Sequence, residues 1–412
     1  MGIPFYFASL IRNHAGIVRR TDAFDVDILG IDFNCLIHHY FKREDPIESV
    51  LEGLQKVTEL CRAKKVFIAF DGLVPYAKIV QQRYRRFKIS EENKHQISPD
   101  TPYMRSLEQA VRERFPDISP TQEPGEGEHK IFQYVKRFEP GQVCIYGLDA
   151  DLILLSLFNK SLTTELNLLR ETDDGFSLMD IHKLSLQLPM EIDQYLALSV
   201  LCFGNDFMPN LGMFSLREDG YARALEYYNK SGKPDMTTEE GRAIFLDYAA
   251  SKEIGVLKER IKFRKQPFER AVIGRQANDI SVKYGLHILD GVIKMEPVVD
   301  AFWKTFHWTM HYFQKNDVLN WDWYYPYAEA PLLQDIVQYY ETGLEKKELT
   351  YTLSQHLQII LPAASLRIAK RRVQFVDEFY SETREPWMKK YDWEVKPRIS
   401  LPWPTLTSVS RF

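Results

Sequence analysis

The sequence predicts an α/β fold with a doubly wound, mainly parallel sheet and a helical, aromatic-rich second module packed against it. Three observations predict this fold. Short apolar runs end at an aspartate at 26–32, 65–71 and 143–149. Stretches with helical spacing separate these runs, as in parallel strands that are covered on both faces. The chain then becomes very aromatic from about residue 296.

The elements follow one another in βαβ order. The apolar runs are the expected strands, and we expect helices at 48–62, 102–115, 129–138 and 194–203. This order implies right-handed crossovers. Ligands of such sheets bind beyond the carboxyl ends of the strands. The aspartates that end the strands are therefore expected to share one site.

The chain divides into three expected regions. Residues 1–215 form the core with the strands, residues 216–295 form a charged helical connector, and residues 296–412 form the aromatic-rich region. The length of 412 residues and the 45% hydrophobic content allow a large core.

Bulk composition excludes some classes of protein. No stretch approaches the roughly 18 apolar residues of a membrane span. Four well-separated cysteines, without a C-x-x-C pair, indicate buried thiols in a reducing, intracellular compartment. The cytoplasm is favoured over the nucleus, because the basic cluster 370–372 is too short for a localisation signal. The net charge of −4 leaves room for a local basic groove.

Seven acidic residues lie in five short islands where elements begin or end. They are Asp32, Asp71, Glu126, Glu128, Asp149, Asp151 and Asp206. Singly, most have a structural explanation as helix caps, first-turn acids or turn formers. Asp149 and Asp151, two residues apart at a strand end, favour a metal role because like charges there repel. Together the seven predict a site for two Mg²⁺ ions, with Mn²⁺ as a possible substitute.

A basic helix lies between the second and third islands. Lys78, Gln82, Arg85 and Arg86 fall at i, i+4, i+7 and i+8, which is one helix face. A charge run is most often a solvated face. A lysine, a glutamine and two arginines on one face also suit a dianionic phosphate. Arg83 points elsewhere and is expected to be solvated or to contact backbone.

At these residues the chain resembles the Xrn family of 5′→3′ exoribonucleases. The matching segments are Met1–Pro4, Asp71–Phe87, Pro124–Lys130, Gly147–Leu152, Gly204–Phe207 and Trp321–Tyr327. The resemblance implies a PIN/flap-nuclease-like sheet and two Mg²⁺ ions held by all seven acids. It implies that Lys78, Gln82, Arg85 and Arg86 bind a 5′-monophosphate. It also implies that His38 and Trp308 stack on the terminal base, although aromatics such as Trp308 are core residues by default.

The implied activity is removal of mononucleotides from 5′-monophosphorylated, decapped single-stranded RNA. Two metals roughly 3.5–4 Å apart would activate water and stabilise the leaving oxygen. The sequence departs from the family at Cys35, Tyr76, Tyr84 and Asn210, none of them an acidic ligand. Two alternatives remain: a flap-type structure-specific DNA nuclease, and an RNA-binding protein with vestigial catalysis. Protein partners are not predicted, and no membrane association is expected.

Overall fold

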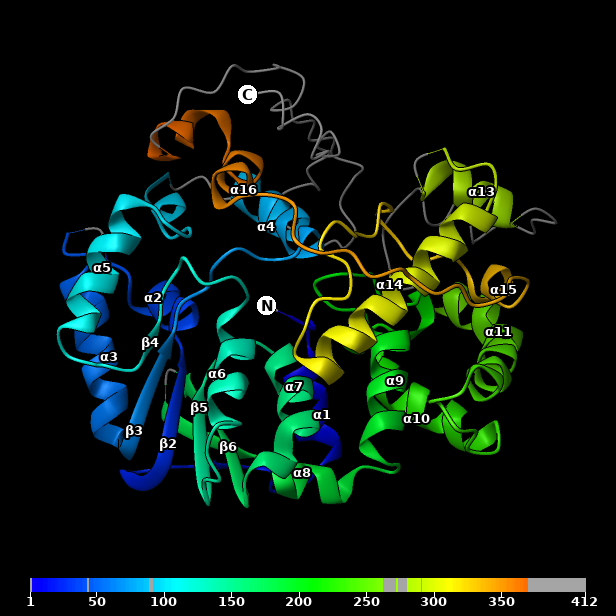
Figure 1. Ribbon diagram of the computed structural model, residues 1–412. Coiled ribbons are helices and arrows are strands. Elements are labelled where there is room, and N and C mark those ends of the chain that lie inside the picture. Colours follow the sequence, from blue (N-terminus) through cyan, green and yellow to red (C-terminus); the bar gives the residue numbers. More distant parts are fainter. Residues whose placement is uncertain are drawn as a thin grey trace.

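The structure is a computed structural model (Figure 1) that describes residues 2–42, 44–88, 92–172, 174–261, 272, 280–289 and 291–369. The last part of the predicted aromatic-rich region, and the basic cluster 370–372, lie outside these residues. Within the described ranges, no helix combines the length and apolar character needed to cross a lipid bilayer.

The described strands form one seven-stranded sheet in the order β1-β7-β6-β5-β2-β3-β4. Neighbours among β2 to β6 run parallel, whereas β7 is antiparallel to both β6 and β1. The mainly parallel sheet is thus confirmed. Its antiparallel edge was not predicted. The strands are β1 Val18–Arg20, β2 Phe24–Asp32, β3 Cys61–Ala69, β4 Ile118–Ser119, β5 Gln142–Tyr146, β6 Glu165–Thr172 and β7 Gly175–Asp180.

The chain changes direction across the sheet at β2. From β2 the order proceeds to β3 and β4 on one side, while β5 and β6 lie on the other. Ile31 of β2 pairs with Ile68 of β3 and with Tyr146 of β5, so the three strands end at one level. The segments that follow them meet at this switch point, where doubly wound sheets bind ligands.

Helices cover both faces of the sheet, and alternate side chains of β2 explain why. Leu29 and Ile31 pack with the helices of one face, whereas Ile28 packs with those of the other. The first face carries α2 Phe33–Tyr40, α3 Glu48–Leu60 and α5 Pro102–Arg112. The second carries α1 Tyr6–Asn13, α6 Gly127–Val135, α7 Asp151–Asn159, α8 Ile181–Gln187 and α9 Ile192–Phe203.

The expected strands and helices are present, with shifted ends. The helix expected at 48–62 ends at Leu60, because Cys61 and Arg62 already pair with β2. β3 and β5 end at Ala69 and Tyr146, so the acids that follow them lie in loops rather than on the last strand residue.

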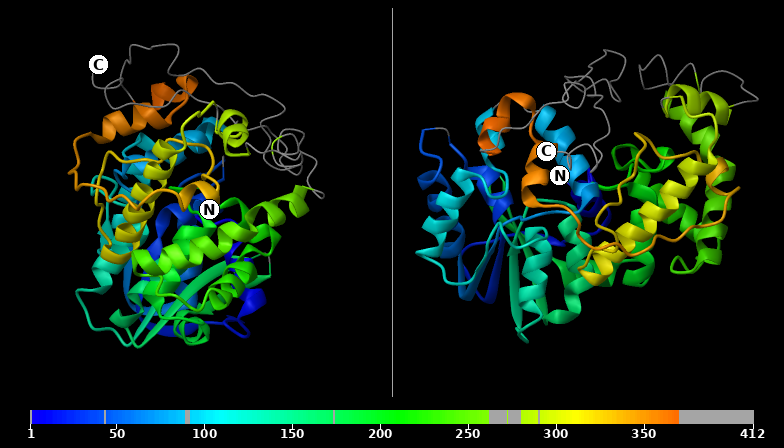
Figure 2. Two further views of the ribbon diagram at one scale, coloured as in Figure 1. Left: turned by 90° about the vertical axis from the view of Figure 1, so that its right-hand side faces the viewer. Right: turned by 45° about the horizontal axis from the view of Figure 1, so that its top comes forward.

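The second half of the chain packs as helices against the sheet domain (Figures 1 and 2). α14 contacts α7 and α9, and α16 lies beside α4, the helix of the basic run. This confirms the helical, aromatic-rich module. Its elements are α10 Gly220–Lys230, α11 Glu239–Ile261, α13 Ile280–His287, α14 Glu296–Lys315, α15 Leu333–Ile336 and α16 Leu353–Ile360; α4 is Tyr76–Lys88.

Candidate functional site

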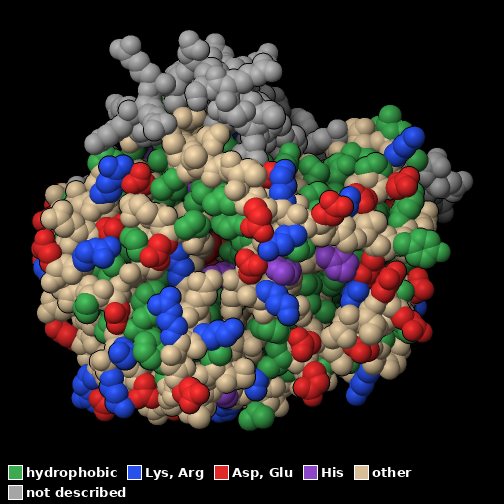
Figure 3. Space-filling view, in the orientation of Figure 1, with side chains coloured by type: hydrophobic (Ala, Val, Ile, Leu, Met, Phe, Trp, Pro, Cys, Tyr) green, Lys and Arg blue, Asp and Glu red, His purple; other side chains and the backbone are tan. Residues whose placement is uncertain are grey.

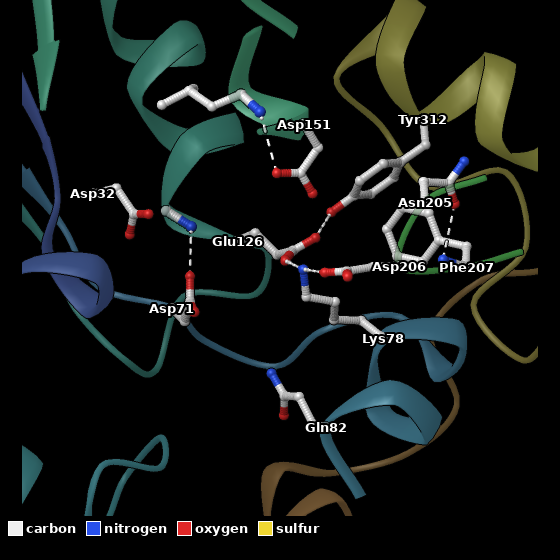
Figure 4. Close-up of polar contacts among 12 residues, drawn as sticks. Asp32, Asp71, Lys78, Gln82, Glu126, Asp151, Asn205, Asp206, Phe207 and Tyr312 are labelled. Atoms are coloured by element: carbon white, nitrogen blue, oxygen red, sulfur yellow. Dashed lines mark hydrogen bonds and ion pairs between the residues drawn. The ribbon is translucent and has the colours of Figure 1, made fainter. Parts of the chain in front are cut away.

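The segments that carry the acidic residues converge at the carboxyl edge of the sheet. Asp32 ends β2, Asp71 follows β3, and Asp149 follows β5. Glu126 and Glu128 stand at the start of α6, Asp151 opens α7, and Asp206 lies in the turn after α9. Figure 4 shows five of these side chains in one view.

Asp32 and Asp71 also have local structural roles. The Asp32 side chain accepts a hydrogen bond from the Cys35 amide at 3.4 Å, as a helix cap does. The Gly127 amide donates to Asp71 Oδ1 at 2.7 Å. A Cβ at Gly127 would lie 3.0 Å from the Ala69 carbonyl oxygen and 3.3 Å from Asp32 Oδ1. Because Gly127 has no side chain, the start of α6 can pack directly against the ends of β2 and β3.

A lysine lies inside the acidic cluster. Lys78 Nζ is 2.6 Å from Glu126 Oε1 and 2.8 Å from Asp206 Oδ2 (Figure 4). The residue is only 7% exposed. Burial alone lowers the pKa of Lys78, but the neighbouring carboxylates, Asp206 first, raise it well above its ordinary value. Sequence reasoning placed Lys78 on a phosphate-binding face, and the structure places its ammonium between two of the acids.

The carboxyl groups repel one another in a buried setting. Burial, followed by the charges of Asp71 and Asp149, raises the pKa of Asp32 well above its ordinary value. Burial, followed by the charge of Asp151, does the same to the pKa of Glu128. Burial also raises the pKa of Asp151 to about 7. Such shifts are typical of sites that need positive charge to hold their acids ionised.

A tight turn presents Asp206. Gly204 has φ +66°, and a Cβ there would lie 2.3 Å from the Asn210 amide nitrogen. The Asn205 side-chain oxygen accepts hydrogen bonds from the amides of Phe207 and Met208 at 2.8 and 3.2 Å. The segment is thus a turn, as its residue types predict, and it brings Asp206 Oδ2 within 2.8 Å of Lys78 Nζ. A role of Asp206 as a metal ligand stays a prediction.

Tyr312 of α14 is a residue that sequence reasoning missed. Its hydroxyl donates a hydrogen bond to Glu126 Oε2 (Figure 4). The ring stacks on Trp308, with centroids 5.0 Å apart, and Phe207 packs edge-on against both rings. The aromatic density of this region was the available signal, but it does not distinguish Tyr312 from its neighbours.

Trp308, the residue expected to stack on a base, is fully buried. Its exposed fraction is 0%, and its Nε1 donates to the Asn320 carbonyl oxygen at 2.8 Å. Phe207 and Tyr312 cover it. The structure thus shows Trp308 as a support for Tyr312, and base stacking by Trp308 stays a prediction.

The basic run forms α4, as its spacing predicts. Gln82 and Arg85 are partly exposed, and the buried Nε of Arg86 has no hydrogen-bond partner among the described residues. Arg83 differs from them: it is fully buried, and its Nη1 donates to the Ile359 carbonyl oxygen at 2.6 Å. Of the two roles expected for Arg83, backbone contact is the one observed.

His38 of α2 lies near the same face. Burial, followed by the charges of Arg86 and Arg85, lowers the pKa of His38 to about 3. The ring is therefore neutral and close to the two guanidinium groups. A neutral imidazole cannot bind phosphate by charge, and stacking of His38 on a base stays a prediction.

Two family models match the sequence. Residues 1–116 and 93–172 match the XRN 5′-3′ exonuclease N-terminus, and residues 281–372 match the Xrn1 helical domain. Together they span more than half of the chain. The chain belongs to the Xrn family.

Named relatives of this Xrn family chain are much longer. It is 23% identical to the human 5′-3′ exoribonuclease 1 over 89% of this chain and 31% of that protein. It is 27% identical to the 5′-3′ exoribonuclease 2 of Debaryomyces hansenii over 53% of this chain and 34% of that protein. The chain thus spans about a third of the length of these relatives.

Solved structures are similar at a lower level, and one of them is a catalytic core bound to DNA. The catalytic core of Rad2 in complex with a DNA substrate has a TM-score of 0.43 and 15% identity, covering 77% of this chain and 97% of that one. A likeness this weak carries no argument about function.

The acids of this cluster are of the kind that suits a hard divalent cation. They offer buried oxygen ligands whose mutual repulsion a metal would relieve. Among the described residues, however, no three acidic, histidine or cysteine side chains are placed so that they could hold a metal ion together. The Lys78 ammonium, held between Glu126 and Asp206, supplies the compensating charge instead.

The charges of the described residues are mixed on the face that Figure 3 shows, so this face is not strongly basic. Figure 3 shows Lys and Arg side chains interspersed with Asp and Glu on the face of Figure 1. This matches the small net charge of −4. Contact with a polyanion would therefore depend on groups such as those of α4, and not on a charged face.

Proposed function

We propose that this Xrn family chain is a divalent-metal-dependent 5′→3′ exoribonuclease that acts on 5′-monophosphorylated single-stranded RNA. One observation supports this most directly. Helix α4 carries Lys78 into the buried acidic cluster and, one turn later, presents the Gln82 side chain toward that cluster (Figure 4). Groups suited to a terminal phosphate thus stand next to groups suited to metal ions.

The seven acids would hold two Mg²⁺ ions, with Mn²⁺ as a substitute. Bound ions would lower the pKa of a water and stabilise the leaving oxygen. The acids would hold and orient these ions, so that no side chain is needed as a nucleophile. The Tyr312 hydroxyl would keep Glu126 in place as a ligand.

The face of α4 would bind the 5′ end of the RNA. Gln82, Arg85 and Arg86 would donate to the oxygens of a terminal phosphate, and His38 would stack on the first base. Lys78 would turn toward this phosphate once metal ions neutralise Glu126 and Asp206. A pocket built for a terminal monophosphate admits neither an internal phosphodiester nor a cap, which makes the reaction exonucleolytic.

The test is degradation of end-labelled single-stranded RNA with Mg²⁺, comparing 5′-monophosphate, 5′-triphosphate and 5′-hydroxyl ends. We expect mononucleotides to be released much faster from the monophosphorylated RNA than from RNA with either of the other two ends. Asp151→Ala should abolish their release, whereas Asp247→Ala, on the exposed side of α11, should not. Internal cuts would favour a flap-type nuclease, and binding without cleavage would favour an RNA-binding protein with vestigial catalysis.

A further inference from the structure

His356 of α16 is hydrogen-bonded to Gln82 of the basic face. His356 Nε2 lies 2.9 Å from Gln82 Oε1, although 274 positions separate the residues. His356 is fully buried. Burial, followed by the charge of Arg86, lowers the pKa of His356 to about 3, so its ring is neutral. An amide oxygen only accepts, and so the single ring proton is on Nε2 and His356 is the donor.

This bond fixes which way the Gln82 amide faces. With Oε1 committed to His356, the Gln82 nitrogen points toward the acidic cluster (Figure 4). In the described part of the chain, that nitrogen has no hydrogen-bond partner. A flipped amide would present its oxygen there, which repels a phosphate instead of donating to it.

His356 is held rigidly enough to set this orientation. A capping box between Thr352 and Gln355 starts α16. Apolar side chains of α16 and α4 form one core, which includes Leu357, Ile360 and Ile79. No described group partners His356 Nδ1, which is also buried. The ring thus makes one polar contact among the described residues, and that contact is with Gln82.

We propose that His356 is a positioning residue for 5′-phosphate recognition. It keeps the Gln82 amide turned so that its nitrogen donates to a terminal phosphate. The inference rests on the proposed function, because it assumes that α4 receives the 5′ end. A residue of the second module would then determine how the sheet domain recognises the end of its substrate.

The experiment measures kcat and KM for RNAs with 5′-monophosphate and 5′-hydroxyl ends in four variants. His356→Leu removes the donor, and His356→Gln restores an N–H donor. Gln82→Leu removes the amide, and a double variant combines the two leucines. We expect His356→Leu to raise KM for the monophosphorylated RNA about tenfold, the cost of one hydrogen bond to a charged group. Its kcat, and its use of hydroxyl-ended RNA, should hardly change, and His356→Gln should recover most of the loss.

The double variant separates positioning from packing. If His356 acts through Gln82, the double variant should lose no more than Gln82→Leu alone. Equal losses on both RNAs, or additive losses in the double variant, would overturn the proposal. If His356→Leu does not fold, Gln82→Leu must still show the selective loss, or the inference fails. If the wild-type protein degraded RNAs with all three 5′ ends equally well, the proposed function would be overturned. If His356→Leu kept the wild-type preference for monophosphorylated RNA, only this inference would be overturned.

Discussion

The Tyr312 hydroxyl donates a hydrogen bond to the Glu126 carboxylate across 186 positions of sequence. Glu126 opens α6 of the sheet domain, and Tyr312 lies on α14 of the helical module. The carboxylate also pairs with Lys78. Its position is therefore set by three elements at once, and the two halves of the chain are joined at the site itself.

We expect Tyr312→Phe to lower exonuclease activity roughly ten- to a hundredfold and to raise the Mg²⁺ concentration needed for half-maximal rate. The hydroxyl donates to a charged group, and losing such a bond costs about 1.5–3 kcal/mol. Rates across a Mg²⁺ titration measure this. Thr309→Val is the matched control, because its buried hydroxyl on the same helix has no partner among the described residues. Similar losses in both variants would mean that the effect is one of packing.

Lys78→Met should destabilise the protein most when metal is absent. Its removal leaves Glu126 and Asp206 buried without the ammonium, and breaking a buried pair costs about 3–5 kcal/mol. Thermal unfolding in EDTA should show the loss. Mg²⁺ should then raise the melting temperature of Lys78→Met more than that of the wild type, because the ions no longer compete with the lysine.

The exposed Lys64, which pairs with Asp27, supplies the control for that measurement. Lys64→Met should change the melting temperature little and respond to Mg²⁺ as the wild type does. A Lys78→Met protein that is as stable as the wild type in EDTA would contradict the compensating role of Lys78.

Gly2→Ala should reduce activity more than tenfold. A Cβ at Gly2 would lie 2.4 Å from Asp151 Oδ1, so it must displace this acid. Gly16→Ala shares the cost of a positive φ, about 1–2 kcal/mol, but its Cβ meets only the flexible tip of Lys183. Initial rates and melting temperatures of the two variants distinguish the displacement of Asp151 from the backbone strain that both variants share. Equal rates would show that Asp151 tolerates the shift.

Glu253→Gln should make stability less dependent on pH. Burial raises the pKa of Glu253 to about 8, so the folded state keeps a proton that the unfolded state releases near its ordinary, lower pKa. Wild-type stability should therefore fall as pH rises from about 5 to 8, by about 1.4 kcal/mol for each pKa unit. Glutamine keeps an oxygen for the Leu333 amide, which donates to Glu253 at 2.8 Å.

Urea unfolding at pH 5, 6.5 and 8 measures the slope. The exposed Glu259→Gln on the same helix should keep the wild-type slope. Parallel slopes for wild type and Glu253→Gln would show that Glu253 does not titrate in this range.

The sequence predicted the parts of the fold that local pattern controls. Apolar runs predicted three of the five described parallel strands, β2, β3 and β5, but not β4 or β6. The acids that end or follow those three strands meet because parallel strands finish at one edge of the sheet. Helix spacing placed Gln82, Arg85 and Arg86 on one face of α4. The antiparallel pairing of β1 with β7 carries no such local signal, since β1 has only three residues and both strands are partly exposed.

Long-range contacts were beyond the reach of these patterns. Spacing says that Lys78 shares a face with Gln82, but not that its side chain is long enough to enter the acidic cluster. Aromatic density marks the region of Trp308 without telling which rings are buried. The Tyr312 and His356 contacts depend on how α14 and α16 pack, which tertiary structure alone determines.

The order of these residues along the chain bears on when the site can be completed. Ribosomes build proteins from the amino end, and domains fold in that order. All seven acids and the basic face leave the ribosome before α14 and α16 are made. In a growing chain Glu126 therefore lacks its contact with Tyr312, and Gln82 lacks its contact with His356. We expect ribosome-bound chains that stop before α14 to leave monophosphorylated RNA intact, so that synthesis itself postpones attack on the nearest RNA, the message being read.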